Sequence, residues 1–294
     1  MGKFAVFTAI IGGYDSICDP LAFDDSFDFI LFTDHVVTER VGVWKVRQVE
    51  YHNEDPIRIA RYVKTHPEEL LPEYDATLWM DANLQITDYF LYDRVKALNE
   101  SDVQVASILH PSRDCAYSEA FEVSRMRFEH SSLAIRWCKL LWKEKYPLNQ
   151  GLFETNIFYR KRTPLVSLFD ADWWNAINSF SKRDQLSCNY CLWKNNVPIG
   201  FVLPQGSHAK KTEHVNFFQH GQKSQRKLIR IGLSERVLLR VWRIMPSYSY
   251  WCYLKLRKTL FPSFSLFLWG WLTSIIAFLI WLSKKIRQLT ISSN

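Results

Sequence analysis

The chain has 294 residues, of which 48% are hydrophobic and 23% charged, so it can bury one large core and is not a disordered protein. Its net charge of +7 is unevenly distributed: 13 Lys or Arg and one Glu from position 223 onward give +12, which leaves −5 for residues 1–222. Because the basic residues are confined to a hydrophobic tail, the charge argues against a nucleic-acid-binding domain and favours a membrane as the partner of that tail.

The first part of the chain alternates between strand and helix patterns. Strand patterns cover residues 3–11, 28–33, 43–49, 76–80, 103–109 and 152–160. Helix patterns cover residues 56–66 and 89–98, two segments between 118 and 146, a segment starting at 163–164, and residues 183–193. Asp55-Pro56 is a typical helix start, with Asp as the N-cap and Pro at the first helical position. The alternation predicts an α/β sandwich in which residues 1–222 form one domain.

Residues at the ends of these elements are candidates for ligand binding. Gly12-Gly13-Tyr14-Asp15 follows the first strand and forms a turn that can approach a ligand closely. The strand at 76–80 delivers Asp81 at its carboxyl end, where open α/β sheets bind ligands. The helix at 56–66 places Arg61 and Lys64 on neighbouring turns.

The tail differs from this domain. Residues 234–245 carry apolar side chains on one helical face and arginines on the other, which indicates a basic interfacial helix or a helix docked on the domain. Residues 264–282 contain no charge and are long enough to span a bilayer; the alternative is a buried helix. We therefore predict a basic amphipathic helical segment at 223–262 and a membrane-anchoring hydrophobic helix with a short basic tail at 263–294.

Cysteine usage and the N-terminus bear on location. The six cysteines show no disulfide-like spacing, and the N-terminal apolar run lacks the features of a signal peptide. We expect the protein at the cytosolic face of a membrane, monotopic or single-pass through its C-terminal hydrophobic segment.

Three groups of residues occur in an order that suits a bound diphosphate. Asp81-Ala82-Asn83 follows a strand and offers oxygen ligands to a hard cation, although an Asp at a strand end is also a common turn residue. Arg183-Asp184-Gln185 joins a carboxylate and an amide at a helix start. His214 and His220-Gly221-Gln222-Lys223 provide imidazole ligands and a cation for phosphate.

Several motifs together resemble the glycosyltransferase-like domain of the turgor-regulation and mucilage-related proteins. The resemblance covers about residues 4–201. It is carried by residues 8–15, 32–34, 61–64, 78–83, 110–119, 151–154 and 183–187. The layout is also similar to glycosyltransferase family 8, in which a D-x-D, an Asp-Gln pair and a His-x-x-Gly-x-Lys motif build the donor site. Here Asn83 replaces the second carboxylate, and His220 to Lys223 departs from the family spacing.

The resemblance implies a GT-A-like (Rossmann-like) nucleotide-sugar-binding fold for the catalytic domain at 1–222, a divalent cation (Mn²⁺ or Mg²⁺) and a nucleotide diphosphate sugar, taken as a UDP-sugar. The metal ligands would be Asp81, Asn83 and His220, and the catalytic residues Asp184 and Gln185. The donor would contact Thr8, Gly12, Tyr14, Asp34, Arg61, Lys64 and Lys223. The acceptor or sugar pocket would include His110, Arg113, Asp114, Tyr117, Glu119 and Arg183; a structural ion-pair cluster is the alternative for residues 110–119.

The resulting hypothesis is a metal-dependent hexosyltransferase that acts on a lipid-linked or growing surface polysaccharide at the membrane. Two alternatives stay open: a membrane-associated lipid amide or ester hydrolase, and a non-catalytic scaffold in polysaccharide assembly. Retention is favoured by the likeness to family 8, whereas inversion requires a base, for which Asp184 and Glu119 are candidates.

Overall fold

The computed structural model describes residues 2–13, 15–219, 229–232 and 236. The described residues divide into two compact units, one drawn from residues 1–116 and 146–226 and one drawn from residues 117–145 and 227–294. The strands are β1 Phe4–Ile10, β2 Phe27–Thr33, β3 Arg40–Val41, β4 Trp44–Gln48, β5 Ala76–Met80, β6 Leu84–Ile86, β7 Val105–Ser107, β8 Ile157–Lys161, β9 Ile199–Phe201 and β10 Val215–Phe217. The helices are α1 Pro56–Thr65, α2 Pro67–Leu70, α3 Phe90–Glu100, α4 Ala116–Arg125, α5 Ser131–Lys143, α6 Pro164–Ser179 and α7 Asp184–Lys194.

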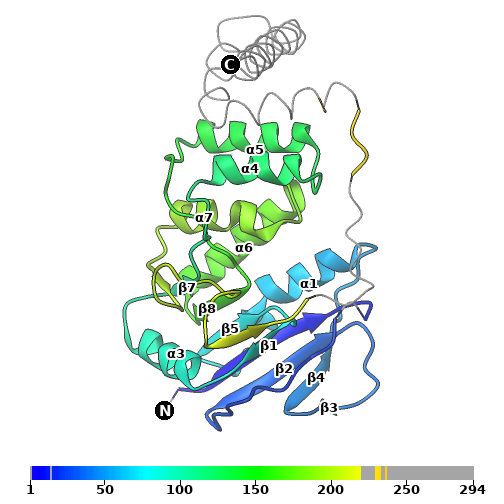
Figure 1. Cartoon of the computed structure of the whole chain (residues 1–294), viewed down its shortest axis with the longest axis vertical. Coiled ribbons are helices and arrows are strands. Elements are labelled where there is room, and N and C mark those ends of the chain that lie inside the picture. The colour runs from blue at the N-terminus through cyan, green and yellow to red at the C-terminus, as the bar shows by residue number, and fades with distance from the viewer. Residues whose placement is uncertain (1, 14, 220–228, 233–235, 237–294) are drawn as a thin grey trace, which may run out of the picture. The chain divides into compact units, whose positions relative to one another are not determined.

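An eight-stranded mixed sheet organises the first unit (Figure 1). Its strand order is β3-β4-β2-β1-β5-β8-β7-β9. The four strands β4, β2, β1 and β5 run parallel, whereas β8 is antiparallel to both of its neighbours. A separate antiparallel pair joins β6 to β10. The predicted α/β class is therefore confirmed, with a mixed rather than a purely parallel sheet.

Local sequence signals account for the helix starts. Asp55 accepts a hydrogen bond from the Ile57 N–H at 3.1 Å, and Pro56 is the first residue of α1, as predicted. Thr163 caps α6 in the same way, with the Val166 N–H donating at 3.4 Å. In both cases a side-chain oxygen satisfies a donor that the first turn of the helix leaves unpaired.

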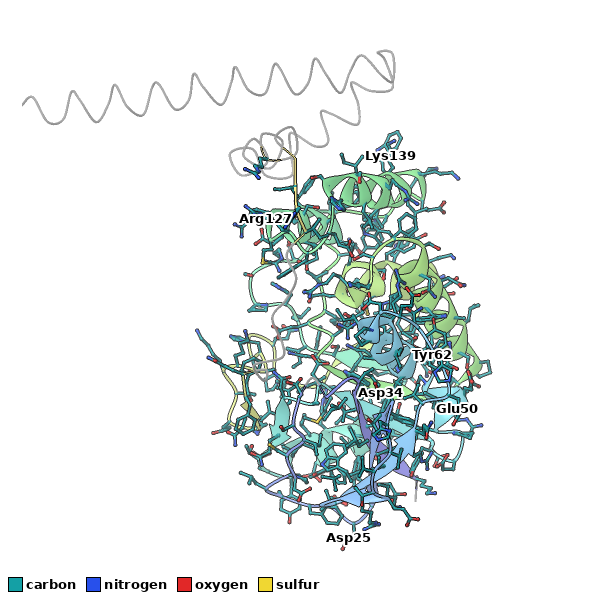
Figure 2. The ribbon with its side chains drawn as sticks, turned by 90° about the vertical axis from the view of Figure 1, so that its right-hand side faces the viewer. Asp25, Asp34, Glu50, Tyr62, Arg127 and Lys139 are labelled. Carbon is teal, nitrogen blue, oxygen red and sulfur yellow. The ribbon has the colours of Figure 1, made fainter. Side chains whose placement is uncertain are left out.

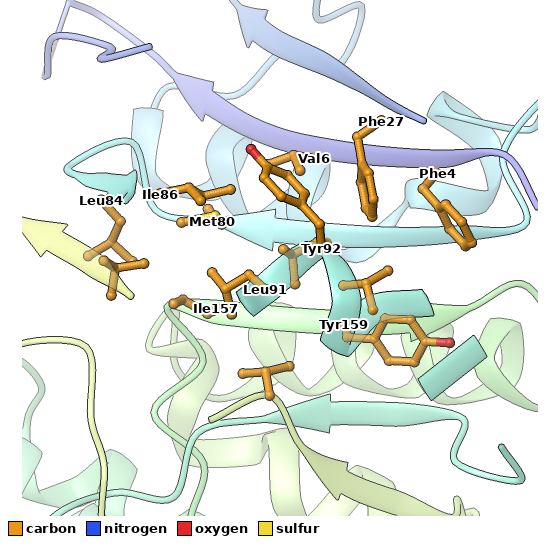
Figure 3. Close-up of a cluster of buried hydrophobic side chains, with 14 of the residues drawn as sticks. Phe4, Val6, Phe27, Met80, Leu84, Ile86, Leu91, Tyr92, Ile157 and Tyr159 are labelled. Carbon is orange, nitrogen blue, oxygen red and sulfur yellow. The ribbon is translucent and has the colours of Figure 1, made fainter. Parts of the chain in front are cut away.

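The two faces of the central strands bury different sets of side chains. On one face, Val6 and Leu78 are opposite each other in register and belong to a buried cluster that includes α3 residues such as Leu91 (Figure 3). On the other face, the rings of Phe7 and Trp79 pack edge to face with centroids 5.3 Å apart. Side chains alternate between the faces of a strand, so β1 and β5 separate two cores.

The prediction of a membrane-anchored chain is corrected by the structure. None of the helices within the described residues is long and apolar enough to cross a membrane. The longest of them, α6, has 16 residues and includes Asp170 and Asp172, whereas a span needs roughly 20 mostly apolar residues. The prediction relied on the hydropathy of residues 264–282, which lie outside the described residues, as do residues 234–245 apart from Arg236. The division of the chain at 222 and 262 stays a prediction.

Candidate functional site

The loops after β1 and β2 are tied together at one edge of the sheet. Ile10 and Thr33 end the two strands in register, so the loops leave the sheet at the same edge. The Gly12 N–H lies 3.0 Å from each carboxylate oxygen of Asp34, which is labelled in Figure 2. Gly12 has a φ of +66°, a conformation that favours glycine. Two of the predicted donor residues are therefore in direct contact.

Asp81 stands at the carboxyl end of β5 and is held on three sides. Its Oδ1 accepts a hydrogen bond from the Trp79 indole N–H at 2.8 Å. Its own N–H donates to the Asn156 carbonyl at 2.9 Å, and its carbonyl accepts from the Leu84 N–H at 2.9 Å. The carboxylate therefore has a fixed orientation at the strand end.

Asn83 has a structural partner. Its side chain is 5% exposed, and the amide nitrogen donates to the Phe218 carbonyl at 2.8 Å. The Phe218 N–H donates in return to the Asn83 carbonyl at 2.9 Å. Asn83 thus fastens the chain just after β10 to the loop between β5 and β6.

A buried ion cluster joins α1 to α7. Asp184 is the first residue of α7 and is 4% exposed. Its Oδ1 lies 3.1 Å from Arg61 Nη2, and its Oδ2 lies 2.5 Å from Lys64 Nζ. The Thr155 hydroxyl donates to Oδ2 at 2.9 Å. Burial would raise the pKa of Asp184, but the charges of Arg61 and Lys64 outweigh it and hold that pKa well below its ordinary value.

Lys64 is enclosed by aromatic rings. Its ammonium lies 5.3 Å from the ring centroid of Trp79 and 5.9 Å from that of Trp173, within the range of cation–π contacts. The Trp173 indole N–H donates to the Asp184 carbonyl at 2.9 Å. Burial lowers the pKa of Lys64, and the charges of Asp184 and Asp81 counteract this in part. Lys64 is therefore within electrostatic range of the strand-end Asp81.

Residues 2–225 match the model of the family described as TOD1/MUCI70, glycosyltransferase-like domain. The chain belongs to this family. The predicted resemblance is thereby confirmed, while the likeness to family 8 stays a prediction.

Relatives of this TOD1/MUCI70-family chain are distant. "Probable hexosyltransferase MUCI70" of Arabidopsis thaliana is 23% identical over 189 residues, which is 59% of this chain and 32% of that protein; the chain thus spans about a third of the relative's length. Among solved structures, the WbbM bifunctional glycosyltransferase has 10% identity and a TM-score of 0.41, and the alignment covers 68% of this chain and 38% of that one. The mannosyltransferase Ktr4p of S. cerevisiae also has 10% identity and a TM-score of 0.41, over 68% of this chain and 68% of its own. Core-mannan synthase A of Aspergillus fumigatus, in a Mn/GDP form, has 11% identity and a TM-score of 0.36 over 68% of this chain and 73% of its own.

Three further predicted site residues, Thr8, Gln185 and Arg183, differ in their burial and in their hydrogen bonds. Thr8 is fully buried within β1, and its hydroxyl oxygen has no hydrogen-bond partner among the described residues. Gln185 is half-buried on α7, and within the same described ranges its amide nitrogen is also without a partner. Arg183 precedes α7, and its N–H donates to the Ser181 hydroxyl at 3.0 Å.

The predicted acceptor segment divides between the two units. The Arg113 guanidinium lies 2.8 Å from His110 Nε2, and the Ser112 and Arg113 N–H groups donate to His110 Nδ1 at 3.2 and 3.0 Å. Asp114, which follows, is exposed. Tyr117 and Glu119 lie on α4 and belong to the second unit. The proposed pocket at 110–119 stays a prediction.

Three predicted ligands, Tyr14, His220 and Lys223, lie outside the described residues. His214, the alternative imidazole ligand, contacts Asp88 and Phe90. Its Nδ1 lies 2.7 Å from Asp88 Oδ2, and its ring stacks on Phe90 with centroids 3.9 Å apart.

Sequence reasoning missed the segment from Glu154 to Asn156. Thr155 contacts Asp184 and the Asn156 carbonyl contacts the Asp81 N–H, so this short segment adjoins both acidic residues. Glu154 is part of a motif that supports the family resemblance, but no local signal assigned it a role. Its position depends on the antiparallel pairing of β8 with β5, which local patterns do not reveal.

The described residues offer a metal ion at this site one oriented carboxylate but no complete set of protein ligands. No group of three or more His, Cys, Asp or Glu side chains within the described ranges is arranged to hold one. Mg²⁺ at nucleotide sites is typically bound by one or two carboxylates together with substrate phosphates and water. The oriented carboxylate of Asp81 meets that requirement.

Proposed function

We propose that this chain transfers a hexose from a nucleoside diphosphate sugar to a hydroxyl group of a glycan, either lipid-linked or part of a polysaccharide, on a GT-A-like domain. Membership of a glycosyltransferase-like family supports the class of reaction. The observation that carries the proposal is the cluster of Arg61 and Lys64 on Asp184, close to the strand-end Asp81.

The cluster suits a leaving group that gains negative charge. When the bond between the anomeric carbon and the phosphate oxygen breaks, the diphosphate takes the electron pair, and fixed cations stabilise it without reorganising. Asp184 neutralises one of its two cations, so the three side chains together keep one positive charge. The side chain of Arg61 is 20% exposed and is the group of the cluster best able to reach a bound phosphate.

The remaining parts of the donor site have defined roles in this proposal. Asp81 would hold the divalent cation, which supplies Lewis-acid stabilisation of the diphosphate when bound. The paired loops at Gly12 and Asp34 would take the nucleoside, because they lie at the carboxyl edge of the parallel strands. Gln185 has an unpaired amide nitrogen within the described residues and would donate to the donor sugar.

The test is release of nucleoside diphosphate from a panel of UDP- and GDP-hexoses, in the presence of free hexoses and methyl hexosides as acceptors. The wild-type protein is expected to release diphosphate from at least one donor, and Arg61→Ala to lower the rate about 10²- to 10³-fold, as the loss of one preorganised charge stabiliser does. Asp25→Ala, at an exposed position, is the control and should leave the rate unchanged.

The cation is tested in the same assay. Treatment with EDTA should abolish turnover, and Mn²⁺ or Mg²⁺ should restore it in the wild type but not in Asp81→Ala. A wild-type protein that releases no diphosphate from any donor would contradict the proposed function. Full activity after EDTA treatment would contradict only the role of Asp81 as a cation ligand.

A further inference from the structure

Glu154 is held in place by its backbone next to the proposed donor site. Its N–H donates to the Ile108 carbonyl at 2.7 Å, and the preceding residue, Phe153, forms a β-bridge with Leu109. The next two residues contact Asp184 and Asp81, as described above. A side chain on such a fixed segment has few alternative positions, which is what a catalytic group requires.

The two oxygens of the Glu154 carboxyl are not equally satisfied. The Ala209 N–H and the Asn156 side chain hydrogen-bond it, and Lys210 lies within electrostatic range. Its Oε2 is buried and has no hydrogen-bond partner among the described residues. Burial raises the pKa of Glu154, and the charge of Asp81 adds to this, while Lys210 and the two hydrogen bonds act in the opposite direction.

A second buried acceptor belongs to the residue two positions further along the chain. Asn156 Oδ1 is also buried without a partner in the part of the chain that the structure describes. Burying an acceptor without a donor costs about 1 to 3 kcal/mol, and such groups in native proteins call for an explanation. The two acceptors can each take an O–H or N–H donor beyond those of the described residues. Sugar hydroxyls are donors of this kind, whereas a diphosphate is not and would be repelled by Glu154.

We infer that Glu154 is the general base of the acceptor site and that Asn156 binds a neighbouring hydroxyl of the same acceptor sugar. This inference rests on the proposed function. The acceptor hydroxyl donates a hydrogen bond to Glu154 Oε2, and its oxygen attacks the anomeric carbon of the donor. The bond from that carbon to the diphosphate breaks with its electron pair on the diphosphate, and the hydroxyl proton passes to Glu154. Attack opposite the leaving group inverts the anomeric configuration.

Asp184, one of the two bases considered from the sequence, fits this step less well, because it is paired through both of its oxygens. Glu154 combines a buried oxygen that has no partner among the described residues with a segment that contacts Asp81.

The closing experiment uses the full chain and whichever UDP- or GDP-hexose the wild-type protein turns over with methyl hexosides. Glu154→Gln should lower kcat about 10²- to 10⁴-fold, the usual contribution of a general base, while donor affinity measured by calorimetry stays unchanged. Glu100→Gln, at an exposed position on α3, is the matched control and should keep wild-type kinetics. Asn156→Ala should mainly raise the KM for the methyl hexoside.

Two further measurements separate a base from other roles. Azide needs no deprotonation, so it should restore diphosphate release to Glu154→Ala and yield a glycosyl azide. NMR of the wild-type product should show inversion. Wild-type kcat in Glu154→Gln, retention with a glycosyl adduct on Glu154, or a loss confined to donor affinity would each overturn the inference. Wild-type inactivity with every donor would instead remove the proposed function and, with it, this inference.

Discussion

Thr155 has two neighbouring carboxylates: Asp184, which its hydroxyl contacts, and Glu154, which precedes it in the sequence. The two carboxylates differ in their partners and in the direction in which their pKa values are shifted. Asp184 is paired with Arg61, Lys64 and the Thr155 hydroxyl, and its pKa is held low. Glu154 keeps one buried oxygen without a partner among the described residues, and its pKa is raised. A paired carboxylate with a low pKa is a poor proton acceptor, whereas one with an unpartnered oxygen and a raised pKa is suited to accept a proton.

This difference in partners distinguishes a residue with a structural role from one with a catalytic role. Asp184 fixes two cations and joins α1 to α7, so its loss should be felt mainly in stability. The Glu154 carboxylate forms no ion pair with another helix or strand among the described residues. Its loss should therefore lower mainly the turnover rate. Carboxylates in one site therefore have to be distinguished by their partners, because residue type and closeness to the site do not distinguish them.

The largest expected effect is on stability at Asp184. Asp184→Ala leaves Arg61 and the buried Lys64 without their counter-charge, and breaking a buried pair from one side costs about 3 to 5 kcal/mol. Urea denaturation followed by circular dichroism measures this loss. The control is Asp172→Ala, which removes a partly exposed pair with Lys194 at 2.9 Å and a hydrogen bond from Asn195 at 3.0 Å and should cost about 1 to 2 kcal/mol. Equal losses in the two variants would contradict the structural role of Asp184.

The pH dependence of stability should follow from the same contacts. Because the folded-state pKa of Asp184 is lowered by Arg61 and Lys64, its contribution to stability is complete above the unfolded pKa of about 4 and is lost as pH falls below it. Asp184→Asn should therefore lack this part of the acid dependence, which denaturation series at several pH values would reveal. An unchanged acid dependence in Asp184→Asn would mean that other groups account for it.

Local features were predicted from sequence, and distant pairings were not. The apolar run at 76–80 and the Asp55-Pro56 start are signals carried by adjacent residues, and both elements are present as predicted. The contact between Lys64 and Asp184 joins residues 120 positions apart, so the sequence indicated both residues but not that one neutralises the other. Strands β6 and β10 have three residues each, too few for a periodic pattern to develop.

Asn83, in the loop that follows β5, should contribute to stability through its side chain. Asn83→Asp would complete a D-x-D motif, but a carboxylate cannot donate to the Phe218 carbonyl. Because Asn83 is 5% exposed, we expect a loss of about 1 to 3 kcal/mol from the lost hydrogen bond and the buried charge. Asn216→Asp, at an exposed position on β10, should change stability by roughly 0.5 kcal/mol or less. Unfolding free energies and Mn²⁺ affinities of both variants would be measured. Tighter Mn²⁺ binding by Asn83→Asp without loss of stability would favour Asn83 as a metal ligand instead.

The smallest expected effect on stability is at Glu154, and it has the opposite sign to that at Asp184. Because burial raises the folded-state pKa of Glu154, the protonated form is favoured on folding. That advantage is complete below the unfolded pKa of about 4.3 and is lost as pH rises through the folded pKa. Glu154→Gln keeps a neutral group at all pH values, so relative to the wild type it should become more stable as pH rises, with Lys210 and Asp81 unchanged. Denaturation series from acid to neutral pH would measure this. A Glu154→Gln variant that is less stable than the wild type at neutral pH would show that Glu154, like Asp184, is a supporting residue.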